Sequence, residues 1–143
     1  MTTVVLDASV AAKWFLPPAD ETLLEEALDL LGRYTKGEVR FIVPDLFWPE
    51  FGNILWKAMR QGRCSRATAD SALADMRNRK LPTFPSLELL DNAFAIAAQF
   101  GRTVYDSVYV ALAIASKAHM VTADERLANA LAAYLPVNWL GSF

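Results

Sequence analysis

The chain of 143 residues has almost none of the residues that build disulfides or thiol- and imidazole-based metal sites. Its one cysteine, Cys64, cannot form a disulfide within the chain, so we expect a reducing compartment. Its one histidine, His119, is expected to have a structural role. The longest apolar run, residues 108–115, is shorter than the roughly 18 residues that cross a bilayer. The first residues also lack the features of a secretory signal, so we expect a cytoplasmic protein without a membrane segment.

Charge and composition indicate a folded domain without a strong net field. Hydrophobic residues make up 54% of the chain and charged residues 21%, which excludes a disordered or fibrous protein. The formal net charge of −2 excludes a protein that holds nucleic acid by bulk positive charge, so any such contact has to be local. No repeat, low-complexity run or linker interrupts the sequence, and we expect one domain over residues 1–143.

Short strand-like segments alternate with longer helical ones along the chain. Strands are expected at residues 4–6, 41–43, 82–84, 119–122 and 137–140. Helices are expected at residues 9–15, 21–31, 49–61, 66–79, 87–100, 107–118 and 125–134. The residues expected to begin helices as caps include Asp20, Ser65, Ser86, Asp106 and Asp124. This alternation predicts an α/β protein in which helices cover both faces of a parallel sheet.

Four carboxylates occupy positions that such a sheet brings together. Asp7 directly follows the first strand, and Asp124 lies two residues after the fourth. Asp106 begins a helix that is apolar almost all round, and Glu50 lies in the first turn of the helix after the second strand. Ligands of open parallel sheets bind beyond the carboxyl ends of the strands, where the strand order reverses. We therefore expect the four carboxylates to converge at that edge.

Taken singly, each acid also has an ordinary structural explanation. An N-cap is worth about 1 kcal/mol and accounts for Asp7, Asp106 or Asp124, while the helix dipole favours Glu50. Together the acids are harder to explain, because like charges about 5 Å apart repel by about 3 kcal/mol per pair at an effective dielectric near 20. A cation would relieve this repulsion. Oxygen ligands without Cys or His indicate Mg²⁺ or Mn²⁺.

The sequence motifs that hold these acids occur in a fixed order: VVLDASV, PE, YDSVYVALA and TADERL, between residues 4 and 127. In this order they resemble the PIN-domain ribonucleases, and most closely the VapC toxins of bacterial and archaeal toxin–antitoxin pairs. The resemblance implies a three-layer α/β/α fold with a mostly parallel sheet of about five short strands. It also implies RNA cleavage that depends on Mg²⁺ or Mn²⁺ and leaves a 5′-phosphate and a 3′-hydroxyl.

Carried over by motif, the family's catalytic and metal-binding quartet corresponds to Asp7, Glu50, Asp106 and Asp124. We expect Asp7 and Asp106 to be direct ligands, and Asp124 and Glu50 to bind a second ion or to orient the water. The resemblance also implies that two hydroxyl residues support the metal, its water or a phosphate. These are Ser9 and Thr122, for which a local hydrogen bond at a helix start or a strand end is an equal explanation.

Basic and aromatic residues concentrate in the middle of the chain. Lys57, Arg60 and Arg63 are candidates for contacts with RNA phosphates, although a solvated charged face explains them equally well. The aromatic residues between 47 and 56 are expected to lie partly in the core and partly on an exposed groove. The resemblance implies that a VapB-like antitoxin occupies such a groove and that the chain forms a homodimer.

The function that these patterns favour is a metal-dependent endoribonuclease toxin. A PIN-like RNA- or protein-binding module without catalysis is the main alternative, and the intact quartet speaks against it. A receiver-type phosphotransfer domain would need a later Lys that the chain lacks. A haloacid-type phosphatase would need an Asp where Ser9 stands.

Overall fold

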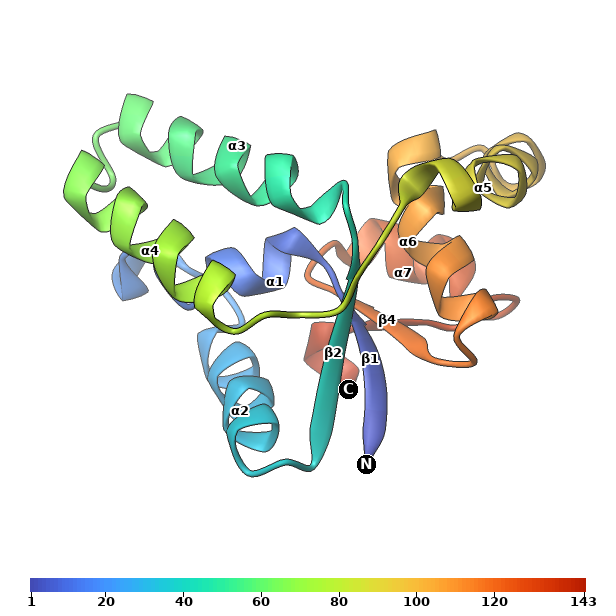
Figure 1. Cartoon of the computed structure of the whole chain (residues 1–143), viewed down its shortest axis with the longest axis horizontal. Coiled ribbons are helices and arrows are strands. Elements are labelled where there is room, and N and C mark those ends of the chain that lie inside the picture. Colours follow the sequence, from blue (N-terminus) through green and yellow to red (C-terminus); the bar gives the residue numbers. More distant parts are fainter.

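The computed structural model describes residues 1–143 as a five-stranded sheet between two layers of helices (Figure 1). The strands are β1 (Thr2–Leu6), β2 (Val39–Pro44), β3 (Thr83–Phe84), β4 (His119–Thr122) and β5 (Val137–Trp139). They lie in the order β3-β2-β1-β4-β5, and every neighbouring pair is parallel. The central strand β1 has the composition that this arrangement requires. Val4, Val5 and Leu6 are all fully buried, because helices cover both faces of the parallel sheet.

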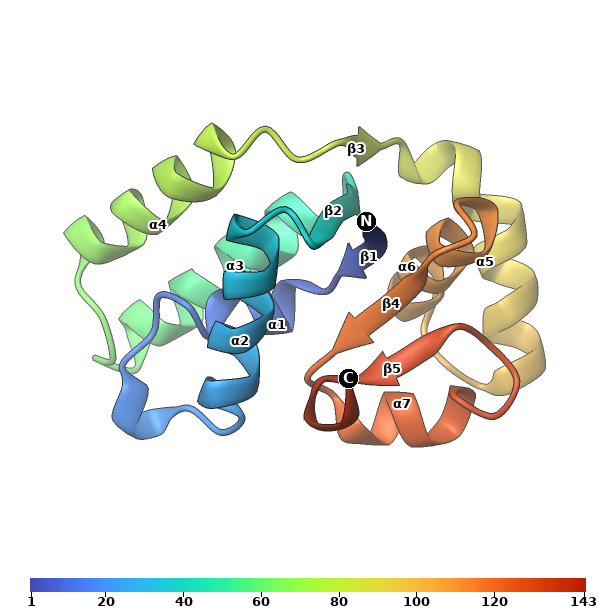
Figure 2. The ribbon, with the colours of Figure 1, turned by 90° about the horizontal axis from the view of Figure 1, so that it is seen from below.

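Seven helices form the two outer layers (Figures 1 and 2). One layer contains α1 (Ala8–Ala12), α2 (Leu24–Thr35), α3 (Phe47–Arg60) and α4 (Arg66–Asn78). The other contains α5 (Ser86–Phe100), α6 (Val104–Ala115) and α7 (Glu125–Leu131). The connections from β1 to β2 and from β2 to β3 cross the sheet in one direction, and those from β3 to β4 and from β4 to β5 cross it in the other. Because such crossovers are right-handed, the two directions place the helices on opposite faces of the sheet. The predicted three-layer α/β/α fold is confirmed.

The strand order reverses between β1 and β4. From β1 the chain moves outward to β2 and β3, whereas β4 leads to β5 on the other side. Leu6 pairs with Val121, and the N–H of Asp7 donates to the Val121 carbonyl at 3.3 Å. The carboxyl ends of the two strands therefore lie side by side, at the point where α/β folds commonly bind ligands.

The segment before α2 differs from the prediction. Asp20 does not cap a helix over residues 21–31, because residues Pro18–Asp20 form a short 3₁₀ turn and α2 begins only at Leu24. The Glu21 carboxylate lies 3.3 Å from Lys13 Nζ and 2.7 Å from an Arg63 nitrogen. Asp20 Oδ2 lies 3.3 Å from Arg63 Nε. These ion pairs hold the segment against α1 and the α3–α4 turn.

Two other predicted caps are also wrong. Ser86 is the first residue of α5, and its N–H donates to the Asp45 carboxylate at 3.1 Å. Thr103 caps α6, because its hydroxyl oxygen accepts the N–H of Asp106 at 3.0 Å. Asp106 therefore lies in the first turn of α6 and its carboxylate is not used as a cap. Ser65 and Asp124 are caps as predicted.

The remaining helices and strands keep their predicted order, with shifted ends. None of the helices is long and apolar enough to cross a membrane.

The aromatic stretch of α3 divides as predicted: Phe47, Phe51 and Leu55 are buried, whereas Trp56 is half exposed.

Candidate active site at the carboxyl ends of β1 and β4

A pocket of about 380 Å³ opens at the carboxyl ends of β1 and β4. It is lined by Asp7, Ala8, Ser9, Pro49, Glu50, Asn53, Ile54, Asp106 and Asp124. We call it the acidic pocket, since the four predicted carboxylates all line it. Asn53 was not predicted, although it follows Glu50 by one turn on α3 and so shares its face.

Asp7 is the most enclosed of the four acids. It caps α1, and its Oδ2 accepts hydrogen bonds from the hydroxyls of Thr122 at 2.6 Å and Ser9 at 3.0 Å. Burial raises the pKa of Asp7 in spite of these donors, and the negative charge of Asp106 raises it further. The fold therefore holds this carboxylate where its ionised form is disfavoured.

Ser9 and Thr122 connect Asp7 to the loop that carries Asp124. The Thr122 hydroxyl oxygen accepts the N–H of Asp124 at 3.0 Å, and the Ser9 hydroxyl oxygen accepts the N–H of Ala123 at 3.2 Å. Each hydroxyl thus donates to Asp7 and accepts from the β4–α7 loop. This arrangement fixes two of the acids relative to one another.

Replacing Thr122 with Val should lower the free energy of unfolding by about 1–3 kcal/mol, the usual result of leaving buried polar groups unpaired. The side chain of Thr122 is fully buried, so water cannot replace its hydrogen bonds to Asp7 and Asp124. Urea unfolding measures the change. Thr122→Ser keeps the hydroxyl and should lose less free energy of unfolding. If Thr122→Val lost no more free energy of unfolding than Thr122→Ser, the hydroxyl of Thr122 would not have this role.

Glu50 is held by a tyrosine from the other helical layer. The hydroxyl of Tyr109 on α6 donates to Glu50 Oε1 at 2.6 Å. Burial raises the pKa of Glu50, and the charges of Asp7 and Asp106 add to this effect. Burial and the nearby carboxylates raise the pKa of Tyr109 far above its ordinary value, so this residue stays a proton donor. Sequence reasoning missed Tyr109, although it follows Asp106 by three residues on the same helix.

Asp106 and Asp124 complete the lining. Burial raises the pKa of Asp106; the charge of Asp124 acts in the same direction, and the positive charge of Arg102 opposes it. Asp124 caps α7, with its Oδ1 accepting the N–H of Leu127 at 3.2 Å. None of the four acids forms an ion pair with Lys or Arg.

The lining fits a hard divalent cation by the type of its donors and by its uncompensated charge. Carboxylate oxygens are the protein ligands that Mg²⁺ and Mn²⁺ prefer, and no basic side chain lines the pocket or forms an ion pair with these four. No three acidic, histidine or cysteine side chains lie close enough together to hold a metal ion as they stand. The fit therefore rests on chemistry and charge, and the ligand set stays a prediction.

Arg63, a predicted RNA contact, has its guanidinium engaged by Asp20 and Glu21. It would have to leave both carboxylates to meet a phosphate. Lys57 and Arg60, the other two candidates, form no ion pair and are exposed at the end of α3.

Comparison with known proteins identifies the family. The family model of the PIN domain matches residues 4–131. Ribonuclease VapC3 of Pyrobaculum aerophilum is 32% identical over 128 residues, which cover 88% of this chain and 92% of that protein. The crystal structure of PAE2754 from Pyrobaculum aerophilum has a TM-score of 0.70 at 23% identity and covers 99% of this chain and 91% of its own. A toxin–antitoxin complex from Klebsiella pneumoniae has a TM-score of 0.61 at 12% identity, with 96% of each chain covered. The chain belongs to the PIN-domain family and, within it, to the VapC proteins.

Proposed function

We propose that this chain is a Mg²⁺- or Mn²⁺-dependent endoribonuclease and the toxin of a toxin–antitoxin pair. The observation that carries the proposal is the acidic pocket, which holds Asp7, Glu50, Asp106 and Asp124 at the switch point of a PIN-family sheet. The relative named Ribonuclease VapC3, similar over most of both chains, supports RNA as the substrate.

In the proposed mechanism, Asp7 and Asp106 are direct ligands of the ion. A divalent ion bound there would polarise the scissile phosphate and lower the pKa of a bound water. Ser9 and Thr122 keep Asp7 oriented, and the Thr103 cap fixes the turn that presents Asp106. These bonds hold the two carboxylates in place before RNA arrives.

The other two acids are proposed to bind a second ion or to orient the attacking water. Tyr109 occupies Oε1 of Glu50, which leaves Oε2 without a donor from the protein and able to accept a proton or a hydrogen bond from water. The cap that Asp124 forms uses Oδ1 only. Each acid therefore keeps one oxygen for the reaction.

A VapB-like antitoxin and a second copy of the chain are the proposed protein partners. A toxin–antitoxin complex is among the structures that share the fold. Exposed apolar side chains suit such contacts: Leu87, Leu90 and Phe94 follow one another along one face of α5. A binding module without catalysis remains the alternative function.

The test is cleavage of total RNA and of a circular RNA by the purified chain, with Mg²⁺, with Mn²⁺ and with EDTA. Only an endonuclease opens the circle. We expect metal-dependent cleavage, and at least about a hundredfold slower cleavage by Asp106→Asn, since even residues outside the ligand shell cost 10- to 100-fold. A chain that neither cuts RNA nor binds Mn²⁺ would instead be the binding module.

A further inference from the structure

Helix α3 runs from the acidic pocket to an exposed basic end. Glu50, Asn53 and Ile54 line the pocket near its start. Lys57 follows Asn53 by four residues and so lies on the same face, one turn further along. At 1.5 Å per residue, Lys57 stands about 10 Å and Arg60 about 15 Å beyond Glu50 along the helix axis. The helix thus connects the carboxylates to the positive charges.

Trp56 is exposed at this basic end. Trp56 is 51% exposed, although the same helix buries three other large apolar residues in the core. The guanidinium of Arg60 lies over its ring, 5.2 Å from the centroid. Trp56, Lys57, Arg60 and Gln61 line a shallow hollow of about 480 Å³. The fold therefore leaves a flat aromatic surface in water beside two cations.

No carboxylate of the protein pairs with the positive charge of Lys57 or of Arg60, although Arg60 also contacts the Trp56 ring. Neither forms an ion pair, whereas the next two basic residues along the chain are paired: Arg63 with Asp20 and Glu21, and Arg66 with Asp70. A surface that joins an open aromatic ring to unpaired cations has the composition of sites that bind single-stranded nucleic acid, in which bases stack and phosphates meet positive charge.

We propose that Trp56, Lys57 and Arg60 bind single-stranded RNA a few nucleotides from the phosphate that is cut. A base stacks on the open part of the Trp56 ring. Lys57 and Arg60, which lie further along α3 from the acidic pocket than Trp56 does, contact the phosphates beside that base. This inference rests on the proposed function for its substrate class. Because every base has a flat face that can stack on an aromatic ring, the site accepts RNA of any base sequence. Its main effect is to fix the position of the RNA strand.

The experiment measures RNA affinity separately from cleavage. A fluorescein-labelled oligouridylate of about twelve nucleotides is titrated in EDTA with Asp106→Asn protein, and fluorescence anisotropy gives the dissociation constant. In the Asp106→Asn protein, a second substitution, Trp56→Leu, should weaken RNA binding about 5- to 100-fold. Trp56→Phe in the same background keeps an aromatic ring and should weaken binding less. Lys57→Gln and Arg60→Gln should each reduce the slope of log affinity against log salt by about 0.7, whereas Trp56→Leu should leave the slope unchanged.

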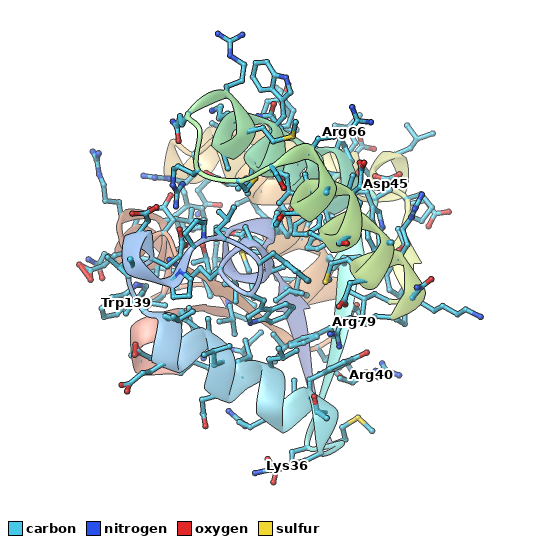
Figure 3. All side chains as sticks on the ribbon, turned by 90° about the vertical axis from the view of Figure 1, so that its left-hand side faces the viewer. Lys36, Arg40, Asp45, Arg66, Arg79 and Trp139 are labelled. Atoms are coloured by element: carbon cyan, nitrogen blue, oxygen red, sulfur yellow. The ribbon has the colours of Figure 1, made fainter.

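Two matched controls lie away from α3. Tyr134→Leu removes another exposed aromatic ring, on the segment after α7. Lys36→Gln removes a positive charge at the end of the molecule opposite Arg66 (Figure 3). Neither should change the affinity or its salt dependence. Thermal melting of each variant shows that it is folded.

Wild-type affinity in both Trp56 variants would overturn the inference. So would a change of molecular mass in solution that accompanies the loss of affinity, since it would assign this surface to a second copy of the chain. If Trp56→Leu loses affinity in a protein that cuts no RNA, the binding site stands and the nuclease proposal fails. If a variant of the active chain with Trp56→Leu binds and cuts as the wild type does, the nuclease stands and the binding site fails.

Discussion

Replacing Asp7 with Asn is expected to reduce RNA cleavage more than about a hundredfold and, at the same time, to stabilise the metal-free protein. The loss of activity follows from the proposed ligand role, because substitutions outside the ligand shell already cost 10- to 100-fold. The gain in stability follows from burial: the folded protein holds the Asp7 carboxylate where its charged form is disfavoured, and Asn carries no charge.

The hydrogen bonds around Asp7 survive this substitution. The hydroxyls of Ser9 and Thr122 both donate to one oxygen, Oδ2, and an Asn side chain can place its carbonyl oxygen there. Only the 3.5 Å bond from the Ser9 N–H to Oδ1 is lost. We expect the free energy of unfolding to rise by about 1–2 kcal/mol, a common size for one substitution. For a chain of this length the melting temperature then rises by about 2–8 °C.

Cleavage assays and thermal melting in EDTA measure the two effects of Asp7→Asn. Asp91→Asn, on the exposed face of α5, is the matched control and should alter neither. Opposite signs for activity and stability indicate a functional carboxylate, because Asn caps a helix about as well as Asp does and a purely structural cap would lose little of either. An Asp7→Asn protein that cuts RNA at the wild-type rate would remove Asp7 from the site.

The placement of the acids was predictable wherever it depends on local sequence. The apolar segment that ends at Leu6 predicts a buried strand, so the position of Asp7 at its carboxyl end follows from the general rule for parallel sheets. The same reasoning places Asp124 after β4. Glu50 was predictable because Pro44 closes the preceding strand and a helical pattern follows.

The features that sequence reasoning missed depend on contacts between distant residues. Tyr109 meets Glu50 across 59 positions of the chain, and Arg63 meets Asp20 across 43. Asp45 accepts the N–H of Ser86 across 41 positions, which makes a cap by Ser86 itself unnecessary. Helix-capping preferences describe a residue and its near neighbours only, so they cannot detect a competing partner that tertiary structure supplies.

The support around each acid also explains why the sequence tolerates so many like charges. Hydroxyl groups hold Asp7 and Glu50, and the Thr103 hydroxyl caps the helical turn that presents Asp106, so none of these acids is paired with a basic side chain. An arginine or lysine partner would stabilise the metal-free pocket but would occupy it. Neutral donors fix the carboxylates and leave their charge for a cation.

Manganese is therefore expected to raise the melting temperature of the wild-type protein and to have little effect on Asp106→Asn. An ion at about one hundred times its dissociation constant stabilises the folded state by about 2.7 kcal/mol. For a chain of this length that corresponds to a rise of about 5–10 °C. The reason is that the ion neutralises acids whose pKa values are raised by burial and by one another.

The same raised pKa values predict how this gain depends on pH. Without metal, the folded protein binds more protons than the unfolded chain at pH values above the ordinary carboxyl pKa of 3.8 for Asp7 and Asp106 and 4.5 for Glu50. This contribution to stability is fully present below those values and is lost as the pH rises through the raised pKa values of the folded protein. Metal binding requires the deprotonated acids, so it becomes stronger over the same range.

The difference in melting temperature between samples with Mn²⁺ and with EDTA should therefore widen from about pH 5 to about pH 8. Using the difference cancels the contributions of titrating groups outside the acidic pocket, which are the same in both samples. Differential scanning fluorimetry at each pH makes the measurement, with Asp91→Asn as the control that should follow the wild type. Mn²⁺ would act outside the acidic pocket if the difference in melting temperature were the same in Asp106→Asn as in the wild type. The same conclusion would follow if the difference in the wild type narrowed as the pH rises.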